Sequence, residues 1–530
     1  MEPPHRHHSS AWNSCRRTLG RRQGCRILLC RTTDDLLNSE LSPLDSKSYW
    51  SLSARIHFDL MECLLDESVH GGILLGVDHD FVWNVRSFAV NCDGRLGLSG
   101  LPNFSMGPKE IAIQRPHPTD TGTKDYVVTA HRISVVHSLP RWLPRTATWL
   151  YNLVRYLPPD ISSHVVCETA ENLAEFPVKN LHRLSASSKT VGWPRALMQK
   201  LRFESLVHRP YRNHLALVIK NHDAVILHSH WGDSACRDVL VAKRLGIAHV
   251  VTFYGKDVNF LPRHDYWFRQ YQVLFENVDR VLCEGKHMAG CIAKLGCAES
   301  KIQVQRLGVE VNKIQFKPRI WCTGPLRILM AGSFREKKGF PDALEALGLL
   351  HHELNLEITI IGDSDSDPRS HPEKSRILRT IEKHQLASKT RLLGYQPHNI
   401  LLNEAYQHHL FLSPSVTAAD GDTEGGAPIT LIEMAATGMP VVSTDHCDIP
   451  SIVIDGKTGL LARERDVPGL LRQLRWLVAH PGSWEGLANA ARSHVEEEFD
   501  VRKQSSKLRD IYFSVSRKES RLGVRELAEA

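Results

Sequence analysis

The sequence predicts an α/β protein built from two Rossmann-like domains in tandem, and three observations support this prediction. From about Tyr126 onward, short apolar strands alternate with helical stretches, which is typical of a doubly wound parallel sheet. The segment from Phe316 to Pro325 contains prolines and a glycine and indicates an interdomain linker. A second series of strands and helices begins directly after it, at Leu326.

Both series have strands that can be placed by their apolar, β-branched character. In the first series we expect a helix at Thr146–Leu157 and strands at Ile133–Ser138, Ala224–Leu227, His249–Thr252 and Arg280–Cys283. In the second series we expect strands at Leu326–Met330, Leu356–Gly362, Thr390–Gly394, His409–Ser413 and Val441–Ser443.

The region before residue 126 is less regular. Its first thirty residues are rich in arginine and have Glu2 as their only acid, which favours a flexible tail over a transit segment. Short strands are expected at Gly72–Val77 and Phe81–Val85. We therefore divide the chain into an extension (1–125, partly disordered or small and β-rich), two Rossmann-like domains (126–320 and 321–500) and a C-terminal helix and tail (501–530).

The composition is that of a large globular protein. Of the 530 residues, 42% are hydrophobic and 24% are charged, and no apolar run is long enough to predict a membrane span. The net charge of +7 is compatible with anionic substrates or an anionic membrane surface but is too small to indicate nucleic acid binding. The 12 cysteines are scattered without a CxxC pair, which favours reduced thiols in a cytoplasmic protein.

The most informative segment reads Thr-Glu-Gly-Gly-Ala-Pro-Ile-Thr-Leu-Ile-Glu and ends at Glu433. Two glycines and Pro428 open a short helix, and a helix start offers backbone N–H groups and a positive dipole end that suit a diphosphate. Glu433 falls in the next turn, where its carboxylate can accept hydrogen bonds from sugar hydroxyls. Glu424 lies in the preceding loop and can face a second group of hydroxyls. The segment therefore predicts a site for a nucleotide diphosphate that carries a sugar.

This segment resembles the paired-glutamate signature of retaining GT-B glycosyltransferases, in particular the group 4 family of exopolysaccharide and lipopolysaccharide enzymes. The resemblance implies that Glu424 contacts the donor sugar and Glu433 the ribose. Eight residues separate the two glutamates here, whereas the family usually has seven, and the extra residue falls in the glycine turn. The donor-binding candidates are Glu433, Gly425, Gly426, Ala427, Pro428, Thr430 and Ser333.

The loop Gly332–Gly339 follows the first strand of the second domain and resembles the family's Gly-Arg…Lys-Gly loop, which holds the donor diphosphate. Lys338 matches the family's lysine. Ser333 occupies the position of the usual arginine, and we expect Arg335, two places on, to substitute for it. Cations at this place stabilise charge on the leaving phosphate, so no cofactor and no metal are expected.

Two loops of the first domain resemble the acceptor side of the family. The segment His228–Gly232, expected to follow a strand, is similar to a His-x-His-x-Gly loop and makes His230 a candidate. Val251–Asp257 matches a Val-Thr-x-His-Gly-x-Asp loop near the anomeric carbon, with Tyr254 in place of the usual histidine. Asp257 is either catalytic or an anchor for its own loop. The catalytic candidates are thus Glu424, Arg335, Lys338 and His230, and the acceptor-side candidates are Tyr254, Gly255, Asp257 and Gly232.

Weaker matches at Arg306–Val309, Leu412–Ser415 and Ile454–Leu461 extend the resemblance over roughly Tyr126 to Tyr512. It implies a GT-B architecture with the active site between the two domains, plus a last helix from Arg502 to about Val515 that packs back on the first domain.

The implied reaction is transfer of a hexosyl group, with retention, from a nucleotide diphosphate sugar to a saccharide or lipid-linked saccharide, as in colanic-acid-type polysaccharide biosynthesis. No nucleophilic carboxylate is evident, and the departing phosphate is expected to take the acceptor's proton. A basic stretch at Arg195–Arg212 is compatible with peripheral contact at the inner face of the membrane, and an exposed helix face explains it as well. Two alternatives stay open: a nucleotide-sugar epimerase of the same fold, and a non-catalytic binding protein, which the departures at Tyr254 and Ser333 permit.

Overall fold

The computed structural model describes residues 75–77, 83–85, 132–144, 148–184 and 208–529. The chain forms two compact units, residues 1–122 and 123–530. In the first unit, the described residues are strands β1 (Leu75–Val77) and β2 (Trp83–Val85), which pair antiparallel and confirm the two short strands predicted there. The arginine-rich first thirty residues lie outside the described part.

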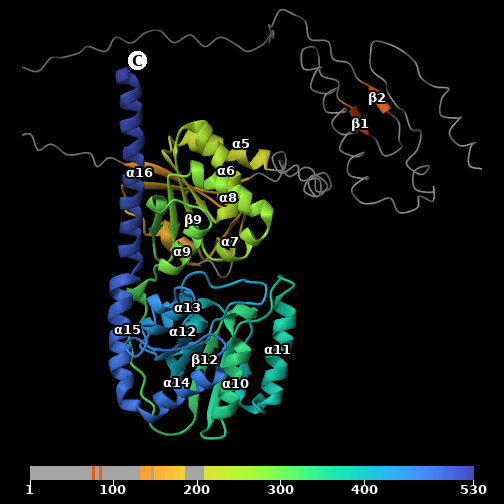
Figure 1. The fold of residues 1–530 in the computed structure, drawn as a ribbon, viewed down its shortest axis with the longest axis vertical. Coiled ribbons are helices and arrows are strands. Elements are labelled where there is room, and N and C mark those ends of the chain that lie inside the picture. The colour runs from red at the N-terminus through yellow and green to blue at the C-terminus, as the bar shows by residue number, and fades with distance from the viewer. Residues whose placement is uncertain (1–74, 78–82, 86–131, 145–147, 185–207, 530) are drawn as a thin grey trace, which may run out of the picture. The chain divides into compact units, whose positions relative to one another are not determined.

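The second unit contains two parallel sheets, which Figure 1 shows one above the other. The upper sheet has the strand order β11-β10-β9-β8-β3-β5-β7, a doubly wound order in which the first strand along the chain, β3, lies inside the sheet between β8 and β5. Its strands are β3 (Ile133–Ser138), β5 (Ile161–Cys167), β7 (Leu181–Arg183), β8 (Ile226–His230), β9 (Ala248–Thr252), β10 (Arg280–Cys283) and β11 (Ile302–Val304). A separate parallel pair is formed by β4 (Arg141–Trp142) and β6 (Thr169–Ala170).

The lower sheet repeats this arrangement with six strands in the order β14-β13-β12-β15-β16-β17. They are β12 (Leu326–Ala331), β13 (Leu356–Ile361), β14 (Thr390–Leu392), β15 (Leu410–Ser413), β16 (Val441–Thr444) and β17 (Leu460–Ala462). Every pairing within both sheets is parallel. The predicted pair of tandem Rossmann-like regions is therefore confirmed.

Helices cover both faces of each sheet, which is why strands such as β8 and β9 are buried along their whole length. The helices are α2 (Thr148–Arg155), α5 (Arg209–Asn221), α6 (Gly232–Leu245), α7 (Lys256–Asn259), α8 (Asp265–Asn277), α9 (Lys286–Lys294), α10 (Phe340–Leu350), α11 (Ser370–Lys383), α12 (His398–Gln407), α13 (Ile429–Ala436), α14 (Val467–Ala479), α15 (Trp484–Glu498) and α16 (Val501–Glu529). Short 3₁₀ helices are η3 (Leu261–Arg263), η4 (Glu299–Lys301), η5 (Val311–Lys313), η6 (Glu336–Lys338), η7 (Ala387–Lys389), η8 (Ile449–Ser451) and η9 (Pro481–Ser483).

The long C-terminal helix α16 follows the lower sheet's last helix and packs on the upper sheet, along which it runs in Figure 1. Leu508, Ile511 and Tyr512 join a core cluster with residues of β3, β8, β9 and β10. The Tyr512 hydroxyl also lies 2.7 Å from Nδ1 of His228. The helix continues to Glu529, well beyond the predicted end at Val515.

The structure differs from the sequence prediction at the His-x-His segment. We expected His228 and His230 in a loop after a strand, and this was wrong because both lie inside β8 with 0% exposure. Polar residues usually indicate a loop, but here the ring nitrogens of His228 and His230 form hydrogen bonds with neighbouring side chains inside the protein. The basic stretch Arg195–Arg212 falls mostly outside the described residues, although Arg209 and Arg212 belong to α5.

The chain passes between the upper half of the unit (the upper sheet with its helices) and the lower half twice, near Val309 and again near Val501. These two crossings of the chain lie side by side. The Val309 N–H donates to the Phe499 carbonyl at 2.8 Å, and the Val501 N–H donates to the Val309 carbonyl at 3.0 Å. A Cβ at Gly308 would lie 2.4 Å from Cα of Val501, so the two crossings are in close contact. Across the part of the chain that the structure describes, no helix combines the length and apolar character needed to cross a bilayer.

Candidate functional site

The centre of the candidate site lies where the order of the lower sheet reverses, between β12 and β15. Ligands of doubly wound sheets bind beyond the carboxyl ends of the strands at such a point. The loop after β12 carries Lys338 and the loop after β15 carries Glu424. The Lys338 Nζ lies 2.8 and 2.9 Å from the two carboxylate oxygens of Glu424. The structure thus brings together two of the predicted catalytic residues.

Several groups fix Glu424. The Ser415 hydroxyl donates to the Glu424 carboxylate at 2.9 Å. The backbone N–H of Glu424 donates to Nε2 of His446 at 3.1 Å. The other ring nitrogen of His446 lies 2.7 Å from the carboxylate of Glu464. Burial opposes ionisation of Glu424, but the positive charges of Lys338 and Lys337 outweigh it and lower the pKa of this carboxyl to about 2. Glu424 is therefore an ionised acceptor for hydroxyl groups at neutral pH.

Arg335 lies beside this pair, but its guanidinium is shared between two carboxylates. It contacts Asp422 at 2.8 Å and Asp367 at 2.9 Å, while its backbone N–H donates to the Ser333 carbonyl at 2.8 Å. Lys337 contacts Asp422 as well, at 3.2 Å. In this arrangement Arg335 holds together the loops that frame Lys338 and Glu424. Its expected role in binding a diphosphate stays a prediction.

The glycine turn after Glu424 leads into α13. Gly425 has a φ of 77°, a left-handed conformation that favours glycine, and Pro428 is the N-cap of the helix. The first turn of α13 contains Thr430. As in any helix, the backbone N–H groups of this first turn point out of the helix end and have no acceptor among the residues of the helix. Ala427 packs into the core beneath the turn.

Glu433 lies on α13 with a side chain that is 10% exposed. Its carboxylate contacts Nε2 of His398, the first residue of α12, at 2.7 Å. This hydrogen bond is the main reason that the pKa of His398 is raised. The second glutamate of the pair, Glu433, thus lies in the second turn of the helix that follows the glycine turn. Its expected contact with a ribose stays a prediction.

Loops at the carboxyl ends of the upper sheet touch this turn. Gly255 has a φ of 125°, and a Cβ there would lie 2.7 Å from the Glu424 carbonyl oxygen. A Cβ at Gly426 would lie 1.9 Å from the carboxylate of Glu284, which follows β10. Only glycine permits these approaches. The two sheets therefore present their strand ends to one another at the predicted donor-binding turn.

The sequence did not single out Glu284 or Asp448. The pKa of Glu284 is raised well above its usual value by burial and by the nearby carboxylates of Asp448, Asp257 and Glu424, in that order. The Asp448 carboxylate accepts the backbone N–H groups of His287 at 2.8 Å and Met288 at 3.1 Å, so a residue of the lower half caps α9 of the upper half. Glu284 directly follows the predicted strand Arg280–Cys283, and this position is the sequence signal that could have identified it as a site residue.

Asp257 anchors the acceptor-side loops. Its carboxylate accepts N–H groups from Gly232 at 2.9 Å, from Tyr254 at 3.0 Å and from Gly255 at 2.9 Å. Burial raises its pKa to about 6 despite these hydrogen bonds. Of the two roles that the sequence left open, this geometry favours the anchor, because the carboxylate ties the start of α6 to the loop after β9.

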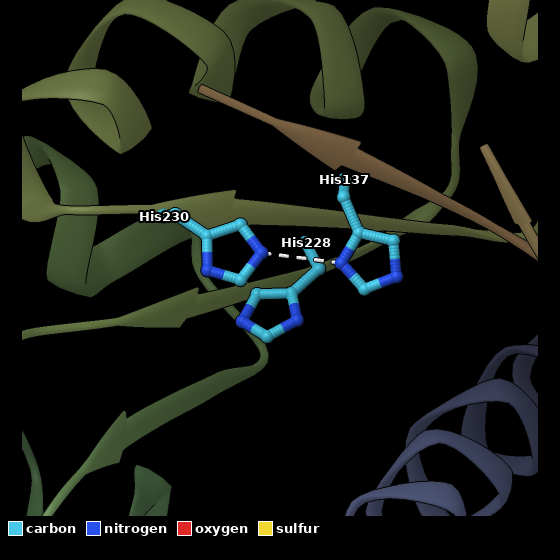
Figure 2. A group of neighbouring side chains, drawn as sticks. All are labelled: His137, His228 and His230. Atoms are coloured by element: carbon cyan, nitrogen blue, oxygen red, sulfur yellow. Dashed lines mark hydrogen bonds between the residues drawn. The ribbon is translucent and has the colours of Figure 1, made fainter. Parts of the chain in front are cut away.

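His230 reaches this region only through Tyr254. Figure 2 shows His230 beside His137 and His228, which come from neighbouring strands of the upper sheet. The Nε2 of His230 lies 3.1 Å from Nδ1 of His137, and its Nδ1 lies 2.6 Å from the Tyr254 hydroxyl. Burial and neighbouring imidazoles lower the pKa of all three histidines. These neutral imidazoles form a buried network under Tyr254, and His230 is placed to orient that phenol.

An aromatic group that the sequence did not predict surrounds Tyr254. The ring of Trp149 lies 4.6 Å and that of Trp231 5.1 Å from it, between centroids. Trp231 has a φ of 71°, unusual for a residue with a side chain, and begins the turn into α6. Such backbone strain concentrates at functional sites. The surroundings of Tyr254, a residue predicted for the acceptor side, are therefore aromatic as well as polar.

Comparisons with known proteins identify the family. A model described as "Glycosyltransferase Family 4" matches residues 123–313, and one described as "Glycosyl transferases group 1" matches residues 312–494. The chain is 30% identical to the amylovoran biosynthesis glycosyltransferase AmsK of Erwinia amylovora over 357 residues, which span 66% of this chain and 84% of AmsK. The chain belongs to this glycosyltransferase family. The predicted resemblance, the enzyme class and the GT-B fold are thereby confirmed.

A further relative and two solved structures are also similar to this chain. A putative colanic acid biosynthesis glycosyltransferase, WcaL of Escherichia coli, is 34% identical over 42% of this chain and 53% of its own length. A glycosyltransferase of Rickettsia africae has the same fold, with a TM-score of 0.57 at 16% identity, over 72% of this chain and 98% of its own. Anabaena HepE, solved in complex with UDP-glucose, gives a TM-score of 0.58 at 13% identity over 72% and 100%.

Proposed function

We propose that this glycosyltransferase moves a hexosyl group from a nucleotide diphosphate sugar to a hydroxyl of a saccharide or lipid-linked saccharide during exopolysaccharide biosynthesis, with retention at the anomeric carbon. The observation that carries the proposal is the Lys338–Glu424 pair beside the glycine turn that opens α13. AmsK and WcaL, named for amylovoran and colanic acid biosynthesis, support the polysaccharide assignment. The solved complex of HepE with UDP-glucose supports a sugar nucleotide as donor.

Each group in the site has a chemical task in this reaction. The N–H groups at the start of α13 and the ammonium of Lys338 bind the diphosphate and stabilise its charge as it leaves. An ammonium has three N–H donors, so Lys338 can hold Glu424 and a phosphate oxygen together. Glu424 then accepts hydrogen bonds from the donor sugar's hydroxyls, and Glu433 from the ribose. Because Lys338 supplies the positive charge, the proposed transfer needs no metal ion.

In the transfer step, the bond between the anomeric carbon and the diphosphate oxygen breaks and a bond to the acceptor oxygen forms on the same face. The acceptor's proton passes to the departing diphosphate. The protein contributes orientation and electrostatic stabilisation rather than a nucleophile. Tyr254, held by His230 and flanked by tryptophans, offers an aromatic face and a hydroxyl to the acceptor side.

The proposal places the reaction in the cytoplasm, at the inner face of the membrane when the acceptor is lipid-linked. The named relatives are glycosyltransferases, which favours transfer over the epimerase and binding-only alternatives.

The test is turnover with a panel of UDP-, GDP- and ADP-sugars. Lys338→Ala should lower kcat by about 100- to 1,000-fold, the size of effect seen when a group that stabilises a developing anion is lost. Glu433→Gln should weaken donor binding by roughly 10- to 150-fold, since hydrogen bonds to charged groups contribute about 1.5–3 kcal/mol.

The matched controls are Lys457→Ala in an exposed turn and Glu357→Gln at the exposed start of β13, which should leave both constants unchanged. Donor binding that is unchanged in Glu433→Gln would refute the assigned site. A donor bound by the wild type and lost in Glu433→Gln, but never turned over with any saccharide acceptor, would instead favour the binding-only alternative.

A further inference from the structure

A second group of histidines lies on the opposite face of the upper sheet from the network in Figure 2. His164 pairs with Val136 across the sheet, whereas His137 is the next residue of β3 and therefore points to the other face. His182 lies on the edge strand β7, and His222 is the C-cap of α5. One nitrogen from each of His164, His182 and His222 lies within 4.8 Å of the other two.

We propose that His164, His182 and His222 bind a late first-row divalent metal ion, with Zn²⁺ the best match, and that this ion fastens the edge of the upper sheet. Three imidazoles with an open fourth position for water suit such an ion, because imidazole is a preferred ligand of zinc, copper and nickel.

The spacing of two of the nitrogens already fits. The Nδ1 of His164 lies 3.2 Å from Nε2 of His182. Two ligands of a tetrahedral zinc ion, with Zn–N bonds of about 2.0–2.1 Å, are roughly 3.3 Å apart. The His222 ring centroid lies 4.0 Å from that of His164 and 4.9 Å from that of His182. One nitrogen of His222 lies within 4.8 Å of those of the other two, and the proposal requires this side chain to rotate toward them on metal binding.

Hydrogen bonds from neighbouring groups orient two of the three proposed ligands, His164 and His182. The Nε2 of His164 lies 3.3 Å from the Ser162 hydroxyl, so an N–H there leaves the Nδ1 lone pair for a metal. Metal-bound histidines usually donate their other N–H in this way. The Nε2 of His214 lies 3.3 Å from the backbone carbonyl of His182 and steadies the edge strand.

Access from solvent also favours this group over the one in Figure 2. His182 and His222 are half-buried, which leaves them open to ions from solvent. In contrast, His228 has 0% exposure and both of its nitrogens have partners, Tyr512 and Thr252.

The position indicates a structural role. The Tyr211 hydroxyl, near the start of α5, donates toward the Val166 carbonyl near the end of β5, so α5 runs antiparallel to the strand and His222 lies toward the strand's beginning. His164 lies in the middle of β5 and pairs with Val136, so the group differs from the His137 network in the face of the sheet that it occupies. An ion there would join β5, the three-residue edge strand β7 and the end of α5.

The experiment titrates the full chain with Zn²⁺ by calorimetry and with Co²⁺ by visible absorption, and follows the melting temperature with and without Zn²⁺. The wild type should bind one Zn²⁺ that the variant His164→Asn/His182→Asn/His222→Asn does not bind, and Zn²⁺ should raise the melting temperature only of the wild type. His371→Asn, an exposed histidine of the lower half, should behave like the wild type.

Each single substitution should weaken this binding by at least 10-fold. Circular dichroism of the metal-free triple variant should match that of the metal-free wild type, so that loss of binding is not loss of folding. Zinc binding with unchanged stoichiometry and affinity in the folded triple variant would overturn the proposal, as would a wild type that binds no Zn²⁺. Donor turnover by the triple variant should equal that of the metal-free wild type, which separates this site from the transfer site.

Discussion

At the residue scale, the candidate site depends on opposite charges held at short distances. Lys338 and Glu424 lie far apart in sequence and meet because β12 and β15 are neighbours. Their pairing keeps Glu424 ionised: the stabilisation it provides is present above the usual carboxyl pKa and is lost as the pH falls toward about 2. Over the physiological range the donor-side carboxylate is therefore charged.

Glu284 behaves in the opposite way and gives a stability test. Its pKa lies well above the usual 4.5, so the folded state favours the neutral form. The stability that this proton provides is complete below the usual value and is lost as the pH rises through the raised pKa. Glu284→Gln, which stays neutral, should match the wild type near pH 4.5 and become more stable than it as the pH rises, by about 1.4 kcal/mol per unit of pKa shift.

The measurement is the melting temperature of both proteins over that pH range. Glu357→Gln, exposed on β13, is the control and should follow the wild type at every pH. Parallel curves for Glu284→Gln and the wild type would show that Glu284 is ionised like an ordinary carboxyl.

The sequence predicted part of this chemistry and missed part for a physical reason. Lys338, Glu424 and Glu433 were singled out because they belong to local motifs beside recognisable strands, and their roles stay predictions. The partners of Arg335 were not, since Asp367 reaches it from the loop before α11 and Asp422 from the loop after β15. A local pattern identifies which residue bears a charge, but the fold decides which opposite charge satisfies it.

At the scale of elements, close approaches of glycine backbones fix how the loops meet. Gly255→Ala should destabilise the protein by about 1–3 kcal/mol, because its φ of 125° disfavours a side chain and its Cβ would lie 2.7 Å from the Glu424 carbonyl oxygen. Donor turnover should fall with it, since the same contact positions Glu424. Denaturant unfolding and turnover measure the two effects.

Gly290→Ala is the matched control for this substitution. Gly290 lies in α9, and a Cβ there meets nothing within 4 Å. Alanine favours the helix over glycine by about 1 kcal/mol, so this variant should be slightly more stable and equally active. Equal stability of the Gly255 and Gly290 variants would show that the loop contact is not tight.

The strands show why element boundaries were harder to predict than element types. Ile328–Met330 and Ile358–Ile361 are apolar runs, and both strands were placed correctly. In β8 the polar residues His228 and His230 concealed the strand's end, because a buried network of imidazoles and hydroxyls replaces the usual apolar side chains. The three-residue edge strand β7 was not predicted, because its sequence Leu-His-Arg has no apolar run.

At the scale of the whole second unit, a single carboxylate links its two halves through a helix cap. Asp448 of the lower half caps α9 of the upper half. Asp448→Ala should therefore loosen the contact between the halves, with a larger radius of gyration in small-angle X-ray scattering and a higher donor KM. Loss of a cap costs about 0.5–2 kcal/mol.

Asp466→Ala makes the same loss inside one half, since Asp466 caps α14 and accepts the Gly469 N–H at 2.9 Å. It should lower stability by a similar amount without changing the radius of gyration or the KM. If both variants scatter alike, the cap on α9 does not govern how the halves meet.

The paired crossings at Val309 and Val501 also determine which movements the two halves can make. Two adjacent, hydrogen-bonded connections favour a hinge rotation about a line that passes near them over sliding of one half past the other. Points far from that line then travel the longest arc. Gly255, Glu424 and Glu284 lie beyond the strand ends, where even a small rotation separates the two sets of loops. Substrate admission and product release would then both depend on rotation about the hydrogen-bonded backbone at Val309 and Val501.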